Sequence, residues 1–446
     1  MDIHVTIDPE QSTAHEFACV RLRAGEGEPS LLELDCSSLR TFGPVEGPGL
    51  EFLYFASVVY GIDKLVPRGL ADDNWTRDLT VHLPVTSPSQ WTAVADDLTR
   101  CLNFLSGDRW DFHFSRRECT LFRPKKVTTR RTLIAPPKTS AVCLFSGGLD
   151  SLIGAIDWLE FNAGENLTLV GHHDPKVPGP SGDQDRLLEI LRPAYRDRTR
   201  ALQTRIGMDP PGDEITLRSR SILFIALGVF AAASLGNLPL LIPENGTIAL
   251  NVPLTPSRRG SCSTRTAHPY YLSTLQSALS GLGIPIRIEN PLGRKTKGEA
   301  VSQCLNQDLI RRLAPVSASC AKRGHTFTWV NKSALNCGRC MPCIYRRAAL
   351  HAVGLDTEVY GADVCTGEVD LDDTELDAPN DFRACISFLR QALPEEQMAS
   401  LLMASGRLPL GDLPAYASVV VRAMDEIRQL LRDKATNDIK RRAGIR

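Results

Sequence analysis

The stretch AVCLFSGGLDSLIGAIDWLE, residues 141–160, decides the fold that we expect. It starts with an apolar run typical of a buried strand and ends in an amphipathic helical pattern. The turn between them consists of Ser146, Gly147, Gly148, Leu149, Asp150 and Ser151. Adjacent glycines let the chain turn sharply and leave backbone N–H groups uncovered by a Cβ. Together with the serine hydroxyls and the positive end of the helix, these groups predict a cradle for an oxyanion.

Outward from this turn, short apolar strands alternate with helical patterns. We expect strands at AVCLF, LTLVGHH, LPLLIPE and PIRIENP, and helices at 151–161, 183–195, 218–236, 270–282 and 297–313. This alternation is typical of parallel βαβ units. The predicted fold class is therefore α/β, with a doubly wound parallel sheet.

Two segments flank this region, so we expect three parts. Residues 1–135 alternate short β-like runs with one helical pattern near 91–104, which predicts an α+β domain. Residues 136–365 hold the strand–helix alternation, and residues 366–446 begin with an acidic linker and continue as helices. The basic stretch at 123–138 is either a solvated connection or a strip that contacts phosphate.

Composition excludes several classes of function. Lys and Arg number 51 and Asp and Glu 52, so no global basic field indicates a nucleic-acid partner. The first residues lack the basic start and apolar run of a signal peptide. The most apolar stretch, 221–243, is broken by Gly and Pro, which predicts a buried helix followed by a buried strand. We expect a cytoplasmic protein without a membrane partner.

The turn at 146–151 also limits the chemistry. The sequence contains neither a Walker A lysine pattern nor GxGxxG, so kinase-like transfer and dinucleotide binding lose support. Asp150 would repel a bare pyrophosphate, and we expect it to coordinate Mg²⁺. The plain alternative is an incidental Ser/Gly turn before a capped helix.

Four of the thirteen cysteines form a cluster late in the chain: Cys320, Cys337, Cys340 and Cys343. The other nine are scattered through apolar surroundings, where a free cysteine behaves as a small hydrophobe. Four thiolates at this spacing predict a closed tetrahedral Zn²⁺ site with a structural role. A [4Fe–4S] cluster and reactive redox thiols are the alternatives.

Three motifs in this order resemble the QueC-type 7-cyano-7-deazaguanine synthases, which are PP-loop ATP pyrophosphatases. They are SGGLDS (146–151), IENPLGRKTKGE (288–299) and Cys320 followed by NCGRCMPC. The resemblance covers about residues 140 to 355 and implies an adenine nucleotide alpha hydrolase-like fold. It also implies that residues 146–151 bind ATP and that Lys297 faces phosphate. Arg220 matches the arginine of a family helix. The alternatives are a solvated lysine and a surface arginine.

The chain departs from those synthases at PENGTIALNVPLTPSRRGSCSTRTAHPYY, residues 243–271. We expect this stretch to line the acceptor pocket, because ligands bind beyond the carboxyl ends of parallel strands. Its STRTAHP segment and the added domains are similar to QueC-like proteins of bacterial Qat-type antiphage systems. Candidate substrate contacts are Glu244, Asn245, Arg265 and His268, with Asp174 as a weaker one. Ordinary loop polarity is the alternative for each.

The resemblance implies a reaction. The synthases activate the carboxylate of 7-carboxy-7-deazaguanine with ATP and then add ammonia. We therefore expect Mg²⁺-dependent adenylation of a deazaguanine carboxylate, with ammonia or an amine of a partner protein as acceptor, in antiviral defence. Two other functions stay open: a catalytically idle scaffold in a defence complex, and a PP-loop enzyme that modifies a nucleobase or tRNA.

Overall fold

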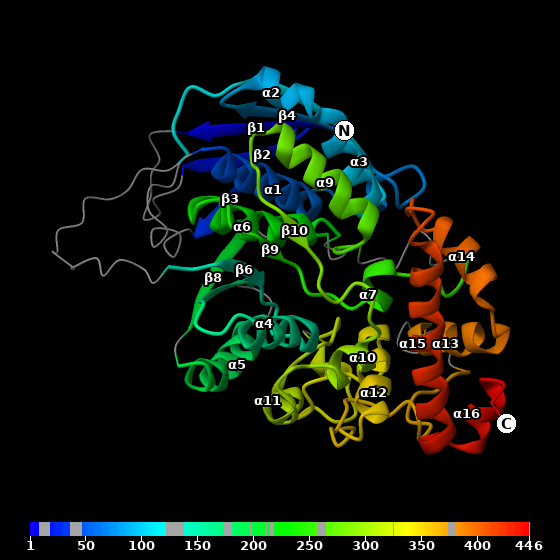
Figure 1. Ribbon diagram of the computed structural model, residues 1–446. Coiled ribbons are helices and arrows are strands. Elements are labelled where there is room, and N and C mark those ends of the chain that lie inside the picture. The colour runs from blue at the N-terminus through cyan, green and yellow to red at the C-terminus, as the bar shows by residue number, and fades with distance from the viewer. Residues whose placement is uncertain are drawn as a thin grey trace.

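The computed structural model describes the chain except for residues 9–17, 36–46, 122–137, 174–179, 197, 211, 215–217, 257–264, 324, 373–379 and 446. Its ten described strands form one sheet in the order β10-β9-β6-β7-β8-β3-β2-β1-β4-β5 (Figure 1). The strands are β1 (Asp2–Asp8), β2 (Cys19–Ala24), β3 (Ser30–Asp35), β4 (Asp78–Val85), β5 (Arg109–Arg116), β6 (Ala141–Leu144), β7 (Leu167–His173), β8 (Thr199–Asp209), β9 (Leu240–Leu241) and β10 (Ile288–Glu289).

One half of the sheet has the arrangement that the sequence predicts. Strands β6, β7 and β8 pair in parallel on one side, and β9 and β10 follow in parallel on the other side of β6. The chain thus adds β7 and β8 on one side of β6 and then β9 and β10 on its other side, as in doubly wound folds. The strand order reverses between β6 and β9. The crossover helices are α4 (Leu149–Phe161), α5 (Pro180–Ala194) and α6 (Arg220–Ser234).

Helices cover both faces of this half. Along β6, Ala141 and Cys143 share an apolar cluster with α4 and α5, whereas Val142 and Leu144 share another with α6. Successive side chains of a strand point to opposite faces, so α4 and α5 lie on one side of the sheet and α6 on the other. The α/β class is confirmed.

The sheet as a whole is mixed, which corrects the expectation of a parallel one. Strand β3 pairs antiparallel with β8, with Leu32 opposite Met208, and so joins the N-terminal strands to the sheet. Strands β1, β2 and β3 are antiparallel neighbours, while β4 is parallel to both β1 and β5. Described residues of the N-terminal segment and of the β6–β9 region also share one apolar core. Segments expected as separate units therefore share a sheet and a core.

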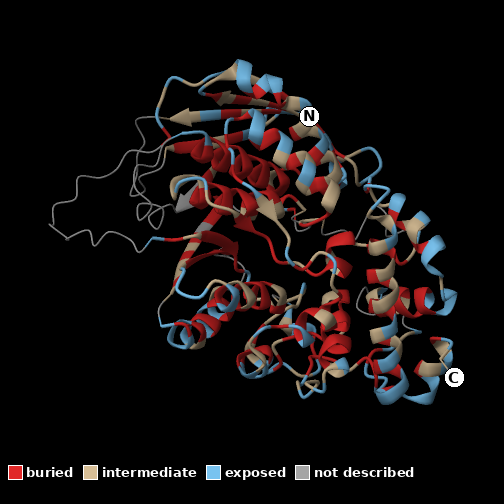
Figure 2. Cartoon of the chain, viewed as in Figure 1, coloured by how far each residue is buried: buried red, intermediate tan, exposed pale blue. Residues whose placement is uncertain are grey.

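The longest helix of the N-terminal segment, α1 (Pro48–Leu65), was not predicted. Residues 49–64 are all buried (Figure 2), and the helix packs against α6. A helix that is buried on every side has no amphipathic period for sequence analysis to detect. The predicted helix near 91–104 is present as α2 (Pro88–Ala93) and α3 (Ala95–Ser106). The predicted helix at 297–313 is two helices, because Asn306 caps the second.

The remaining helices form the lower right of Figure 1, except α9. They are α7 (Gly246–Leu250), α9 (Pro269–Gly281), α10 (Lys297–Ser302), α11 (Gln307–Leu313), α12 (Met341–Ala352), α13 (Asn380–Gln391), α14 (Glu395–Met403), α15 (Leu413–Lys434) and α16 (Asn437–Arg442). Helix α15 packs against α7, α12 and α14 around a second apolar core. The expected C-terminal helices are thus joined to the region that follows β9.

The apolar stretch 221–243 contains most of α6 and strand β9, as predicted. Among the described helices, none combines the length and the hydropathy that crossing a bilayer requires.

A fragment comprising residues 138–446 is expected to aggregate when it is expressed without the N-terminal segment. Loss of the N-terminal segment would expose the edge of β8 and the side of α6 that packs against α1. An open strand edge and an exposed apolar surface both promote aggregation. Size-exclusion chromatography of the fragment beside the full chain checks this. A soluble monomer with a cooperative thermal transition would show that residues 138–446 fold without the N-terminal segment and would contradict the prediction.

Candidate functional site

A cavity of about 350 Å³ lies where β6 and β9 end. This is the point at which strand order reverses, and open α/β sheets bind ligands there. The predicted site residues that line it are Ser146, Gly148, Leu149, Asp150, Ser151, Arg220, Glu244, Lys297 and Cys320. The structure therefore brings together residues from five separate stretches of the chain.

The turn after β6 has the backbone that its glycines predict. Gly147 has a φ of 85°, and a Cβ there would lie 3.3 Å from the amide of Gln184. The Gly148 amide is 3.3 Å from Ser146 Oγ, which lies 3.2 Å from the hydroxyl of Ser151. Helix α4 starts directly after this turn, so its positive end faces the cavity. The turn can bind an anion.

Asp150 is held on both carboxylate oxygens. Lys297 Nζ donates to Oδ1 at 2.7 Å, and Asn245 Nδ2 donates to Oδ2 at 2.9 Å. The Lys297 side chain is only 4% exposed, so it is not a solvated surface lysine. Asn245 is fully buried and caps α7 through Ile248 N, at 3.2 Å. Asn245 was expected to contact substrate. It is not among the residues that line the cavity, and it contacts Asp150 instead.

Helix α15 supports the start of α10, which carries Lys297. Thr296 and Glu299 form a capping box at this start. Arg422 Nε donates to Glu299 Oε1 at 2.6 Å, and Glu426 accepts the Gly298 amide at 3.3 Å as well as the Thr296 hydroxyl. The C-terminal segment thereby contributes to the placement of Lys297.

Glu244 is a half-buried residue of the cavity lining whose carboxyl oxygen Oε2 is buried. Its backbone is fixed by Asn290, whose Oδ1 accepts the Glu244 amide at 3.2 Å. Its Oε2 has no hydrogen-bond partner among the described residues. Burial, and then the negative charge of Asp150, raises the pKa of Glu244 to about 8, although Lys297 partly opposes the shift. Glu244 is thus protonated at neutral pH when the site is empty.

Further lining residues were missed by sequence analysis. Asp183, which is 3% exposed, accepts from Arg323 Nε at 3.1 Å across the cavity wall. Ser319 Oγ accepts the Leu149 amide at 3.3 Å. Ser319 and Arg323 flank Cys320 in sequence, and that proximity was the only signal that could have found them. No sequence motif around Asp183 indicates that it belongs to the site.

Arg265 and His268 are not among the residues that line this cavity. Arg265 Nη1 donates to the Phe104 carbonyl at 2.6 Å, and its guanidinium lies 4.4 Å from the Phe104 ring. His268 caps α9 by accepting the Tyr270 amide at 3.2 Å, and burial lowers its pKa to about 3. Thr266, which lies between them, lines the cavity. Asp174 lies outside the described residues.

The cysteine cluster has the geometry of a metal site. The four ligand atoms of Cys320, Cys337, Cys340 and Cys343 lie within 4.8 Å of one another. The sulfurs of Cys337 and Cys343 are 3.7 Å apart, and tetrahedral Zn²⁺ with bonds of about 2.3 Å needs about 3.8 Å. Gly338 has a φ of 80°, and a Cβ there would lie 2.1 Å from the Ala362 carbonyl. This group can hold a metal ion such as zinc.

The segment that carries the cysteine cluster, residues 317–343 and called the metal lobe below, is joined directly to the turn after β6. The Ala318 amide donates to the Gly147 carbonyl at 3.1 Å, and Ala318, Ser319 and Cys320 line the cavity. Asn336 Oδ1 accepts the Ser319 amide at 3.0 Å and so ties this wall to the residues before Cys337. Loss of the metal should therefore disturb the cavity as well as the lobe.

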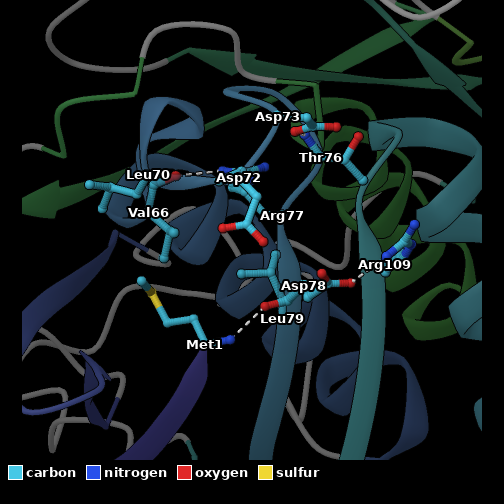
Figure 3. Close-up of a pocket in the computed structure, with 11 residues that line it drawn as sticks. Met1, Val66, Leu70, Asp72, Asp73, Thr76, Arg77, Asp78, Leu79 and Arg109 are labelled. Carbon is cyan, nitrogen blue, oxygen red and sulfur yellow. Dashed lines mark hydrogen bonds and ion pairs between the residues drawn. The ribbon is translucent and has the colours of Figure 1, made fainter.

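A second cavity of about 380 Å³ lies in the N-terminal segment, between Met1 and the starts of β4 and β5 (Figure 3). None of the predicted site residues lines it. The cavity at the ends of β6 and β9 is therefore the candidate site.

Comparison with known proteins adds no identification: no family model, curated protein or solved structure matches the chain.

Replacement of Cys337 by Ser is expected to remove the bound metal and lower the melting temperature, because the metal's binding energy contributes to folding. Elemental analysis and thermal unfolding of the purified variant check this. Cys143→Ser makes the same chemical change at a buried thiol outside the cluster and should keep the metal. A full-length protein that is stable and carries no metal would contradict the prediction, and iron with visible absorption would identify a cluster.

Replacement of Glu244 by Gln is expected to stabilise the protein increasingly as the pH rises. The folded-state pKa of Glu244 is raised to about 8 from 4.5, so its stabilising contribution is complete below about pH 4.5 and is lost by about pH 8. Glutamine keeps the shape without the charge. The melting-temperature difference between variant and parent should grow from pH 5 to pH 8 and then level off. Exposed Glu28→Gln is the control, and a pH-independent difference would refute the shift.

Proposed function

We propose that this protein is a PP-loop ATP pyrophosphatase that adenylates the carboxylate of a 7-deazaguanine-type base. The observation that carries the proposal is a single cavity at the β6–β9 reversal that gathers an anion-binding turn, the cations of Arg220 and Lys297, and the carboxylate of Asp150. The order of SGGLDS, IENPLGRKTKGE and the cysteine cluster, which resembles the QueC-type synthases, gives independent support.

The residues of the cavity suit a pyrophosphate group. The hydroxyls of Ser146 and Ser151 can donate hydrogen bonds, and the positive end of α4 favours an anion at the same place. Arg220 and Lys297 bring positive charge from the first residues of α6 and α10, two helices from distant parts of the chain. Charge that develops on the phosphates during bond cleavage would be stabilised by these preorganised groups.

The proposed first step joins the substrate to AMP. A carboxylate oxygen of the deazaguanine attacks the α-phosphorus of ATP, the bond to the bridging oxygen breaks, and pyrophosphate leaves into the turn. Adenylation is needed because an ionised carboxylate is a poor electrophile without a usable leaving group. The chain's own contribution is to hold the two reactants in contact and to keep water out.

The donor set fits Mg²⁺, which prefers carboxylate oxygens. Asp150 would hold the ion, because each of its oxygens accepts one hydrogen bond and keeps a further lone pair. Bound Mg²⁺ would neutralise phosphate charge and act as a Lewis acid. The cysteine cluster, in contrast, has four sulfur ligands and no open position, so we assign Zn²⁺ there a structural role.

The second step transfers the acyl group. The amine of ammonia or of a partner protein attacks the acyl carbon, AMP leaves, and an amide forms. The N- and C-terminal additions, which the resemblance relates to antiphage proteins, favour a partner protein in a defence complex as the source of the amine. Such added surface beside a ligand site is where new specificity is built.

Incubation with Mg-ATP, 7-carboxy-7-deazaguanine and labelled pyrophosphate is expected to give exchange of label into ATP, with AMP as the only nucleotide product and pyrophosphate as the leaving group. Asp150→Ala should lower the exchange rate about 100-fold or more, because it removes the proposed metal ligand. Asp157→Asn, on the same helix α4 but bonded to the Leu305 amide instead, is the matched control.

Stoichiometric ADP would refute the proposal, and no exchange by the parent protein would leave the idle scaffold as its function. The acceptor is then identified by mass spectrometry of reactions with ammonium, or with the presumed partner protein and no ammonium.

A further inference from the structure

Four charged side chains form a buried network in the N-terminal segment: Asp63, Arg68, Arg77 and Asp108. Each side chain is at most 4% exposed. Arg77 Nη2 donates to Asp63 Oδ1 at 2.5 Å and to Asp108 Oδ2 at 2.6 Å, and Arg68 Nη1 donates to Asp108 Oδ1 at 2.8 Å. Two cations and two anions balance, so the network can stay ionised away from water.

This network lies beside the second cavity. Arg77 lines that cavity together with Val66, Leu70 and Leu79 (Figure 3). Arg77 Nη1 also donates to the Val66 carbonyl at 2.7 Å, and Val66 directly follows α1. The guanidinium thus fixes the C-terminal end of α1, which carries Asp63 in its last turn.

The other oxygen of Asp63 reaches across to a distant part of the chain. Asp63 Oδ2 accepts the Ser219 amide at 2.8 Å and the Ser219 hydroxyl at 2.7 Å. Ser219 is the N-cap residue of α6, is fully buried, and makes no side-chain cap of its own. The carboxylate of Asp63 therefore satisfies the amide at the start of α6, where a negative charge is also favoured by the helix dipole.

The residue after Ser219 is Arg220, which lines the nucleotide cavity. Helices α1 and α6 pack in opposite directions: a Cβ on Gly49, near the start of α1, would lie 3.1 Å from Ala233 near the end of α6. Contact at both ends prevents α6 from sliding or unwinding at its first turn. The direction of the Arg220 side chain depends on that first turn, because each helical residue rotates by about 100°.

We infer that Asp63 is a positioning residue for Arg220, so that the N-terminal segment sets the phosphate-facing arginine of a site more than 150 residues away in sequence. The inference rests on the proposed function of the cavity. It assigns the N-terminal segment a part in ATP binding without any contact between that segment and the nucleotide.

A double-mutant cycle with Asp63→Asn and Arg220→Ala tests this, with calorimetric affinity for Mg-ATP as the readout. Each single variant should weaken binding about tenfold, since each removes or misdirects one charge-assisted contact. Asp63 acts only through Arg220, so the double variant should bind as weakly as Arg220→Ala alone. Hydrogen exchange should also quicken at the first amides of α6 in Asp63→Asn.

Glu51→Gln is the matched control, because Glu51 lies on the same helix in a buried ion pair with Arg117, at 3.0 Å, near the other end. It should lower thermal stability and leave the affinity for Mg-ATP unchanged. If Asp63→Asn does not fold, Ser219→Ala is used in its place. This variant removes one of the two hydrogen bonds between Asp63 and Ser219. It should weaken Mg-ATP binding about threefold in the parent and have no effect in Arg220→Ala.

Additive losses, about 100-fold in the double variant, would overturn the inference and leave the proposed function standing. Failure of the parent protein to bind Mg-ATP would overturn both.

Discussion

The parallel pairing of β6 with both β7 and β9 is the constraint from which the site follows. Because the chain leaves β6 toward α4 and returns to β9 through α6 on the opposite face, the segments after the two strands diverge. The cavity occupies the space between them. Asp150 after β6 and Glu244 after β9 enter it from its two sides, and Lys297 closes it from α10.

Each part of the chain outside this parallel half reaches one wall of the cavity. The metal lobe donates from Ala318 to Gly147, helix α15 caps the start of α10 through Glu426, and α1 caps the start of α6 through Asp63. These contacts act on backbone at the beginnings of elements, where a small displacement changes the direction of a side chain. Such a site is sensitive to substitutions far from it. Its turn is held by the metal lobe, Lys297 depends on α15, and Arg220 depends on α1.

The buried charged groups that hold the fold differ from the carboxyl group that lines the cavity. In the network of Asp63, Arg68, Arg77 and Asp108, buried charges are paired and hydrogen-bonded. Glu244 differs, because its buried Oε2 has no hydrogen-bond partner among the described residues, and burial raises its pKa. A buried polar atom of this kind is costly to keep in a folded protein. Its retention in the wall of a cavity is consistent with a group that interacts with a ligand.

The features that the sequence determined by itself are those encoded within a few neighbouring residues. The turn at 146–151 is specified by glycine backbone freedom and a following helix, and the metal site by ligand spacing, so both were predicted with their residues. The tertiary structure alone decided the rest. Helix α1 is buried on every side, the mixed sheet depends on the pairing of β3 with β8, and Asp63 meets Ser219 across 156 positions. Arg265 and His268 share the chemistry of binding residues, yet packing turns them toward Phe104. Local geometry follows from the spacing of residues within a short motif. Contacts between distant segments depend on how the faces of helices and strands pack, and no short sequence pattern encodes that packing.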